Sequence, residues 1–289
     1  MNTTLRSTIQ LLRFPFSFFL MPVFWFALSI LPLVNWTKAL LIFFILHLLV
    51  YPASNGYNSY MDRDTTPIGG VKNPMQPTPQ LLRVTTSMNL LALSLGFLVS
   101  GVFVAGIFFY IVASLAYSWR KIRLKKYPLL GYAVVIIFQG ALAFFIVYYD
   151  ASATPNPPVP VLGLIAAALL IGGFYPLTQI FQHEADKKDG VTTISYLLGY
   201  KGTFIFTGIV YAFAFTILGW FYFLQNEMRS FYILQVCLLP VLVYFFIWFN
   251  KVIKEKKEAN YANTMRMNVL ASLCSSVAFI TLLIIKVVE

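Results

Sequence analysis

The sequence predicts an all-α, polytopic membrane protein. Composition, the length of the apolar runs and the placement of the basic residues each point to this class. Of the 289 residues, 59% are hydrophobic and only 11% are charged, whereas soluble domains average about 45–50% and about 25%. This composition excludes a soluble globular enzyme, a disordered chain and a disulfide scaffold.

Nine apolar segments are candidates for membrane helices, each of which needs roughly 20 mostly apolar residues. They are residues 16–34, 38–53, 87–102, 104–118, 129–149, 161–178, 204–224, 231–250 and 268–286. The third and fourth form one unbroken stretch that is too long for a single crossing at about 1.5 Å per residue. Gly96, Gly101 and Gly106 favour a tight helical hairpin there.

The basic residues support this count of spans. With a cytoplasmic N-terminus, 18 of the 21 Lys and Arg residues fall on the cytoplasmic side, and only Lys38, Arg229 and Lys286 fall outside. Basic loops are typical of the cytoplasmic face, so we expect the N-terminus inside and the C-terminus outside. The net charge of +11 then reflects these loops and the lipid bilayer, and we expect no nucleic-acid partner. No small-residue cleavage pattern follows the first apolar run, which fits a bacterial inner membrane protein.

Two regions, 51–80 and 175–202, begin with the same pattern of polar residues. The first contains Tyr51, Pro52, Asn55, Asn58 and Asp62, and the second contains Tyr175, Pro176, Gln179, Gln182 and Asp186. The offsets from the tyrosine are 0, 1, 4, 7 and 11 in both regions. The two amides and the carboxylate therefore share one face of a helix. Solvated helix ends are the simpler interpretation, but polar groups near the membrane tend to face a cavity, and repeated halves often meet at a binding site.

The chemistry that these side chains share is capture of Mg²⁺. Hard cations take oxygen ligands, often one or two carboxylates together with the phosphates of a substrate. Asp62 and Asp186 supply carboxylates, while Asn58 and Gln182 add carbonyl oxygens or donate to phosphate. Further acids lie close in sequence and are candidates for an outer layer around the metal: Asp64, Glu184 and Asp189. The two cysteines and two histidines form no metal-binding pattern.

These motifs resemble those of the UbiA superfamily of intramembrane prenyltransferases. Residues 54–62 occupy the family's Asn-Asp-x-x-Asp-x-x-x-Asp motif, and residues 179–186 occupy its Asp-x-x-Asp-x-x-x-Asp motif. Tyr117 and Lys121 match the family's Tyr-x-x-x-Lys element after the fourth helix. Residues 12–15 are similar to the start of its first helix, and residues 189–199 look like its Gly…Thr-Leu…Leu-Gly stretch. The similarity covers most of the chain.

The resemblance implies one membrane domain over residues 1–289, folded as a nine-helix bundle with two related halves. It also implies transfer of an isoprenyl group from a prenyl diphosphate to an aromatic or lipid acceptor, with Mg²⁺ held by Asp62 and Asp186. The residues expected to contact or neutralise the diphosphate are Asn55, Asn58, Gln179, Gln182, Arg13, Arg63, Lys72 and Lys121, with Tyr117 as a hydrogen-bond donor. The allylic cation left by the diphosphate needs a dry, aromatic-rich chamber.

The chain departs from the family pattern at four of the six motif aspartates, which are Asn55, Asn58, Gln179 and Gln182. Another register places Asn58 and Asp62 at the start of the first motif, but the internal repeat favours the register above. A site with fewer acids is expected to bind metal more weakly. Two alternative functions therefore stay open: an enzyme that cyclises or hydrolyses a prenyl diphosphate without an acceptor, and a non-catalytic lipid-binding or transport protein.

Overall fold

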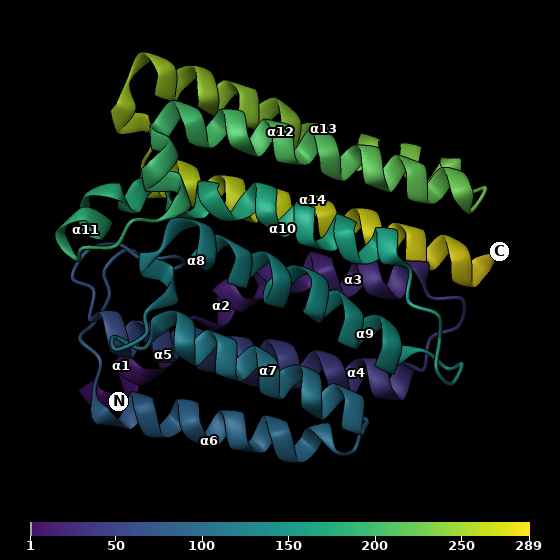
Figure 1. Cartoon of the computed structure of the whole chain (residues 1–289), viewed down its shortest axis with the longest axis horizontal. Coiled ribbons are helices and arrows are strands. Elements are labelled where there is room, and N and C mark those ends of the chain that lie inside the picture. Colours follow the sequence, from purple (N-terminus) through teal and green to yellow (C-terminus); the bar gives the residue numbers. More distant parts are fainter. Residues whose placement is uncertain (1) are drawn as a thin grey trace.

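The computed structural model describes residues 2–289, which form a bundle of long helices without a β-sheet (Figure 1). The helices up to residue 118 are α1 (Thr3–Leu12), α2 (Phe14–Ser17), α3 (Met21–Ile30), α4 (Trp36–Phe44), α5 (Tyr51–Asp62), α6 (Pro79–Gly96) and α7 (Gly101–Ser118). Those that follow are α8 (Pro128–Val135), α9 (Ala143–Ala151), α10 (Val161–Gln179), α11 (His183–Lys188), α12 (Ile194–Leu224), α13 (Met228–Lys254) and α14 (Tyr261–Val288).

Eight helical segments within residues 2–289 are long and apolar enough to cross a membrane. They correspond to eight of the nine expected spans. The remaining span, expected at 87–102, is α6, which instead begins at Pro79 and ends at Gly96. Its first turns carry Arg83 and several hydroxyl and amide side chains, so it is less apolar than the others, and the number nine is approximate. The turn before α7 lies at 97–100, inside the region where we expected a hairpin.

The two repeated motifs end their helices differently. The first lies on α5, which continues without a break to Asp62 and follows α4 through a π-helical stretch, Ile45–Val50. The second starts on α10, but the chain tightens into a 3₁₀ turn at Ile180–Gln182 before α11 begins. The expectation that each motif lies on one continuous helix is therefore correct for the first motif and wrong for the second.

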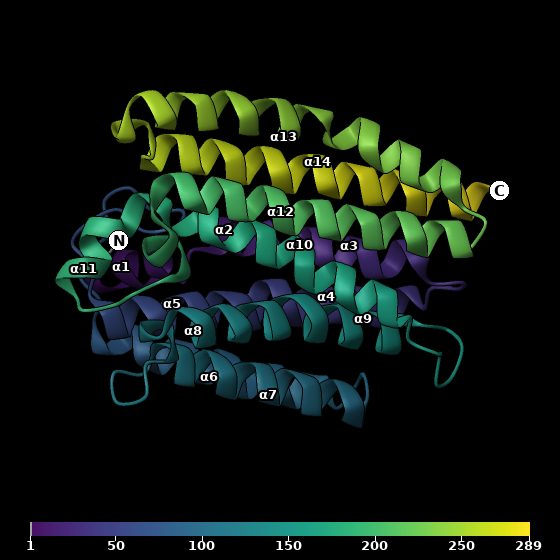
Figure 2. The same ribbon diagram turned by 45° about the horizontal axis from the view of Figure 1, so that its top comes forward.

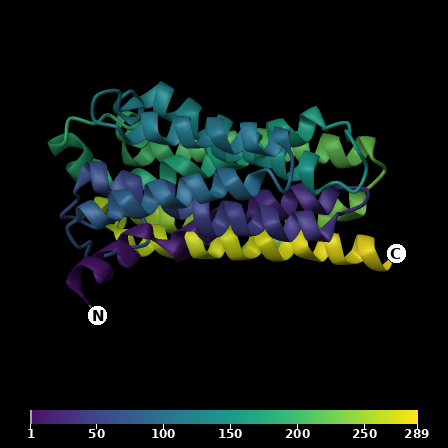
Figure 3. The same ribbon diagram turned by 90° about the horizontal axis from the view of Figure 1, so that it is seen from below.

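The helices run roughly side by side, and the two termini lie at opposite ends of the bundle (Figures 1 and 3). Helix α10 packs on α12, α13 on α14, and α14 on α3, which brings the last helix against the first part of the chain (Figure 2). Gly173 permits close packing in the first of these pairs, because a Cβ there would lie 2.9 Å from the Tyr211 ring. The N-terminus and α11 share one end of the bundle, which we call the motif end (Figure 1).

Candidate functional site

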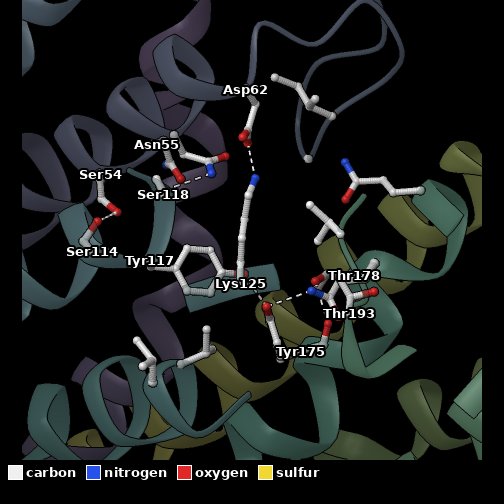
Figure 4. Close-up of a pocket in the computed structure, with 18 of the residues that line it drawn as sticks. Ser54, Asn55, Asp62, Ser114, Tyr117, Ser118, Lys125, Tyr175, Thr178 and Thr193 are labelled. Carbon is white, nitrogen blue, oxygen red and sulfur yellow. Dashed lines mark hydrogen bonds and ion pairs between the residues drawn. The ribbon is translucent and has the colours of Figure 1, made fainter. Parts of the chain in front are cut away.

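A cavity of about 200 Å³ at the motif end collects both repeated motifs. It is bordered by α5 and α7 from one half and by α8, α10 and α11 from the other (Figure 4). All six polar motif side chains line it: Asn55, Asn58, Asp62, Gln179, Gln182 and Asp186. The repeat therefore brings two sets of amides and carboxylates to one shared space.

The first carboxylate, Asp62, is held by two basic side chains. Its side chain is only 5% exposed, and Lys125 donates a hydrogen bond to its Oδ2 atom (Figure 4). The Nη2 atom of Arg123 lies 3.6 Å from its Oδ1 atom, and Arg123 also pairs with Asp189. Burial and the neighbouring Asp62 charge raise the pKa of Asp64, in the loop after α5, to about 6.

Both basic residues come from the segment between α7 and α8. Helix α7 ends at Ser118, and Arg123 then adopts a left-handed backbone with φ of 50° that turns the chain back toward the cavity. The short turn Leu124–Lys126 follows and packs closely on α8. A Cβ at Gly131 would lie 3.1 Å from the Lys125 Cα atom, so glycine permits this contact.

Arg13 organises the amides of the first motif. It is buried in the break between α1 and α2. Its Nη2 atom donates to the backbone carbonyl oxygen of Asn55 at 3.0 Å and to the side-chain Oδ1 atom of Asn58 at 3.4 Å. The Asn58 Nδ2 atom in turn donates to the Ser118 hydroxyl at 3.1 Å. A cationic side chain that itself lines the cavity therefore lies beside the amide of Asn58.

The second wall carries a hydrogen-bonded chain of neutral groups. The Gln179 Nε2 atom donates to the Tyr175 hydroxyl at 2.7 Å, and that hydroxyl is hydrogen-bonded to Tyr117 across the cavity (Figure 4). The Thr193 hydroxyl donates to Asp186 at 3.3 Å. The Oε1 atom of Gln179 is buried and has no hydrogen-bond partner among residues 2–289, so it is available to a ligand.

Below this layer the cavity becomes more apolar. Ser54 and Ser114 face each other at 2.5 Å, eight residues from Asp62 on α5 and four from Ser118 on α7. At about 1.5 Å of rise per residue, Ser54 lies roughly 12 Å deeper than Asp62. The surrounding side chains are Tyr110, Ala113, Val134, Val135, Phe138 and Gln139. A polar mouth thus leads to a less polar interior, in which aliphatic and aromatic side chains join Ser54, Ser114 and Gln139.

The structure brings most, but not all, of the expected site residues together. Those that line the cavity are Arg13, Asn55, Asn58, Asp62, Asp64, Tyr117, Gln179, Gln182, Asp186 and Asp189. Those that are exposed and do not line it are Arg63, Lys72, Lys121 and Glu184. The Lys121 ammonium lies over the Trp119 ring, 5.8 Å from its centre.

The sequence patterns did not single out Lys125 and Arg123, which were counted only among the basic residues of the cytoplasmic loops. Their place depends on the left-handed turn at Arg123, and no periodic pattern reports such a turn. Tyr175 was noted only as the start of the repeat, although its hydroxyl faces the cavity (Figure 4). The cue available for it was its position one helical turn before Gln179.

The cavity offers oxygen ligands that fit Mg²⁺. Among residues 2–289, no three His, Cys, Asp or Glu side chains are grouped closely enough to form a metal cluster on their own. The carboxylates of Asp62 and Asp186 nevertheless line the same cavity, and the Asp62 Oδ1 atom is buried without a hydrogen-bond partner. Mg²⁺ is commonly bound by one or two carboxylates that share it with substrate phosphates and waters, so a partial set of this kind suits it.

Comparisons with known proteins agree with this geometry. Residues 19–270 match the model of the UbiA prenyltransferase family, whereas no curated protein sequence matches significantly. A UbiA homolog from Archaeoglobus fulgidus bound to DMAPP and Mg²⁺ superposes with a TM-score of 0.72 at 18% identity, over 96% of this chain and 99% of that one. The same homolog bound to GPP and Mg²⁺ gives a TM-score of 0.71, with the same identity and coverage.

A digeranylgeranylglyceryl phosphate synthase has the same fold. It superposes with a TM-score of 0.62 at 15% identity, over the full length of both chains. The structural likeness extends over nearly the whole molecule, and the family match covers most of the sequence. The chain is an integral membrane protein that belongs to the UbiA prenyltransferase family.

Proposed function

We propose that the protein is a Mg²⁺-dependent prenyltransferase that moves an isoprenyl group from a prenyl diphosphate to an aromatic or lipid acceptor. The observation that carries the proposal is the single cavity in which the carboxylates and amides of both motifs meet above a less polar interior. The family match and the UbiA homolog structures bound to DMAPP or GPP with Mg²⁺ support the class of donor substrate.

The diphosphate would occupy the motif end, and the isoprenyl chain would extend toward Tyr110 and Phe138. Most basic loops lie at this end, because the loops after α5, α7 and α11 all reach it (Figure 1). By the excess of Lys and Arg on cytoplasmic loops, we propose that the motif end faces the cytoplasm and that the C-terminus lies outside. A bacterial inner membrane remains the proposed location.

Asp62 and Asp186, with Asn58 and Gln182, would hold Mg²⁺, which when bound neutralises charge on the departing diphosphate. Arg13 and Lys125 add fixed positive charge at the same place, where preorganised groups stabilise the leaving group without reorganising. The Tyr117 hydroxyl can donate to a phosphate oxygen. The apolar interior excludes water from the allylic cation, which leaves the acceptor as the available nucleophile.

One observation favours a non-catalytic lipid-binding protein as the second candidate. Asp62 is already neutralised by Lys125 and Arg123, so the chain can keep its fold without a metal. The two candidates differ in whether the bond between the isoprenyl carbon and the diphosphate is broken.

Release of diphosphate separates these candidates. Purified protein is incubated with dimethylallyl, geranyl, farnesyl or geranylgeranyl diphosphate, with Mg²⁺ or with EDTA, and with or without a lipid extract as a source of acceptors. We expect Mg²⁺-dependent release that increases with acceptor and is lost in Asp186→Asn. Release that does not depend on acceptor indicates a cyclase or hydrolase, and binding without release from any donor indicates the non-catalytic protein.

A further inference from the structure

The segment between α7 and α8, residues 119–127, contacts Asp62 of the first motif and Asp189, which follows the second motif, and we call it the basic loop. Arg120 donates to the carbonyl oxygens of Met61 at 2.6 Å and Asp62 at 3.1 Å. Arg123 contacts both Asp62 and Asp189. The basic loop is therefore held by contacts with both motif regions, and one of its residues, Lys125, lines the cavity.

Lys125 is the member of this loop that enters the cavity. Its side chain is 13% exposed, its ammonium is hydrogen-bonded to the Asp62 Oδ2 atom, and it lines the cavity beside the motif residues (Figure 4). The Lys125 ammonium thus competes with a divalent ion for the Asp62 Oδ2 atom, while the Oδ1 atom has no hydrogen-bond partner among residues 2–289.

Asp186 of the second motif has no such direct partner. Within residues 2–289, Asp186 takes part in no ion pair, and the only side chain that donates to it is Thr193. Both carboxylates line the same cavity, and Lys125 is near enough for its charge to act on Asp186 too, but only Asp62 is in direct ion pairs. A divalent ion therefore has less negative charge to balance beside Asp62 than beside Asp186.

We propose that Lys125 is a protein-borne cation that replaces one divalent ion on the Asp62 side of the diphosphate site. When a prenyl diphosphate binds, the Lys125 ammonium is shared between Asp62 and the phosphate oxygens, while Mg²⁺ binds on the Asp186 side. This inference rests on the proposed function, because it concerns the same diphosphate. A lysine suits the task because its ammonium is a compact charge on a flexible stem that binds phosphate without a fixed bidentate geometry.

The inference accounts for the shortage of acids in the two motifs. Carboxylates are needed in number when all of the positive charge around a diphosphate comes from metal ions. If Lys125 and Arg13 supply part of that charge from the chain, fewer carboxylates are required. The amides at Asn58 and Gln182 then contribute neutral oxygen and NH₂ groups without adding negative charge that a metal would have to balance.

Binding of geranyl diphosphate without a divalent metal tests this inference. The full-length protein is purified in detergent, and its affinity for geranyl diphosphate is measured by calorimetry in EDTA and again during titration with Mg²⁺. We expect the wild type to bind in EDTA. We expect Lys125→Met to weaken binding in EDTA by roughly 10- to 100-fold, the range for loss of one charge-assisted hydrogen bond, and to require more Mg²⁺ for half-maximal binding.

Two further variants serve as controls. Lys126→Met removes the same charge from the next residue, which is exposed and does not line the cavity, and it should leave the affinity unchanged. Lys125→Arg keeps a cation at the position and should restore most of the affinity in EDTA. Thermal unfolding of each variant identifies any loss of fold, and the wild-type measurement in EDTA needs no variant.

The results separate this inference from the proposed function. If the wild type binds only with Mg²⁺, or if Lys125→Met and Lys126→Met behave alike in EDTA, the role of Lys125 is overturned while a Mg²⁺-dependent transferase stands. If geranyl diphosphate binds neither in EDTA nor with Mg²⁺, and the longer donors fail as well, the proposed function itself is wrong.

Discussion

The two motif regions have the same spacing of tyrosine, proline, amides and acid, yet they surround the cavity with different chemistry. Asp62 ends a continuous helix and is paired with Lys125 and Arg123. Asp186 follows a break in its helix and accepts a hydrogen bond from Thr193. A repeat in the sequence has therefore become an asymmetric site, with cations from the chain on one side and an acid without an ion pair on the other.

The repeated tyrosines differ in the same way. Tyr51 is 3% exposed and packs in the core against His47 and Tyr110. Tyr175 instead lines the cavity and shares hydrogen bonds with Tyr117 and Gln179. The tyrosine of the first motif region thus packs in the core, whereas the tyrosine of the second lines the candidate site. Equal spacing sets which helix face a residue occupies, but the neighbouring helices decide what that face contacts.

The largest effect expected from this asymmetry is in the two carboxylates. Asp186→Asn and Asp62→Asn should each lower kcat/KM for a prenyl diphosphate by about 10²–10³-fold, because each removes a carboxylate that would position the cations, Mg²⁺ or Lys125, that stabilise the charge on the departing diphosphate. Only Asp62→Asn should also lower the Tm, because it leaves Lys125 and Arg123 partly buried without their carboxylate partner. Steady-state diphosphate release and thermal unfolding provide the two measurements. Equal Tm values for the two variants would show that the ion pairs of Asp62 with Lys125 and Arg123 do not contribute to the stability of the fold.

Adding acids back should affect the two sides unequally. Gln182→Asp should lower the Mg²⁺ concentration for half-maximal activity by about 10-fold, since it places a second carboxylate beside Asp186. Asn58→Asp should change it less, because the Asn58 side chain is already bonded to Arg13 and Ser118. Titration of diphosphate release with Mg²⁺ compares the variants. A larger response in Asn58→Asp would place the main metal on the side of Asp62.

Much of the fold follows from the sequence because the bilayer limits the choices. Apolar length and the placement of basic residues located eight segments that satisfy the requirements of a span. The start of α6 was missed by eight residues, since Arg83 and its polar neighbours interrupt the apolar pattern while the helix itself continues back to Pro79. Hydropathy indicates which part of a helix can lie in lipid. It does not give the ends of the helix, because these also depend on capping residues and on packing against neighbouring helices.

The site could be predicted only where it depends on periodicity. The i, i+3, i+7 spacing identified six polar side chains that the structure places in one cavity, although their roles in metal and diphosphate binding stay predictions. Lys125 could not be found this way. Its position depends on the left-handed turn at Arg123, on contacts with Asp62 some 60 residues earlier, and on the absence of a side chain at Gly131. These are tertiary effects with no local pattern.

A smaller effect is expected from Gly131→Ala, which acts on the position of the basic loop. The added methyl group would lie 3.1 Å from the Lys125 Cα atom and must move the loop backbone by a few tenths of an ångström. Alanine favours the helix by up to about 1 kcal/mol over glycine, so the Tm should change little while kcat/KM falls by roughly two- to five-fold. Gly101→Ala, where a Cβ meets nothing within 4 Å, is the matched control and should leave kcat/KM unchanged. Equal activity in both variants would mean that the loop position does not limit catalysis.

The smallest effect is expected at Lys121. It tests whether the lysine that binds the diphosphate is the one that matches the family motif or the one that lines the cavity. The resemblance gives the diphosphate-binding role to Lys121, yet this residue is exposed, lies over Trp119 and does not line the cavity. Lys121→Met should therefore change kcat/KM by less than about two-fold, because a solvated charge outside the site contributes little, whereas Lys125→Met should lower it by at least about 10-fold. The reverse order would mean that the basic loop rearranges when substrate binds and exchanges one lysine for the other, so that the pairing of Lys125 with Asp62 belongs only to the ligand-free protein.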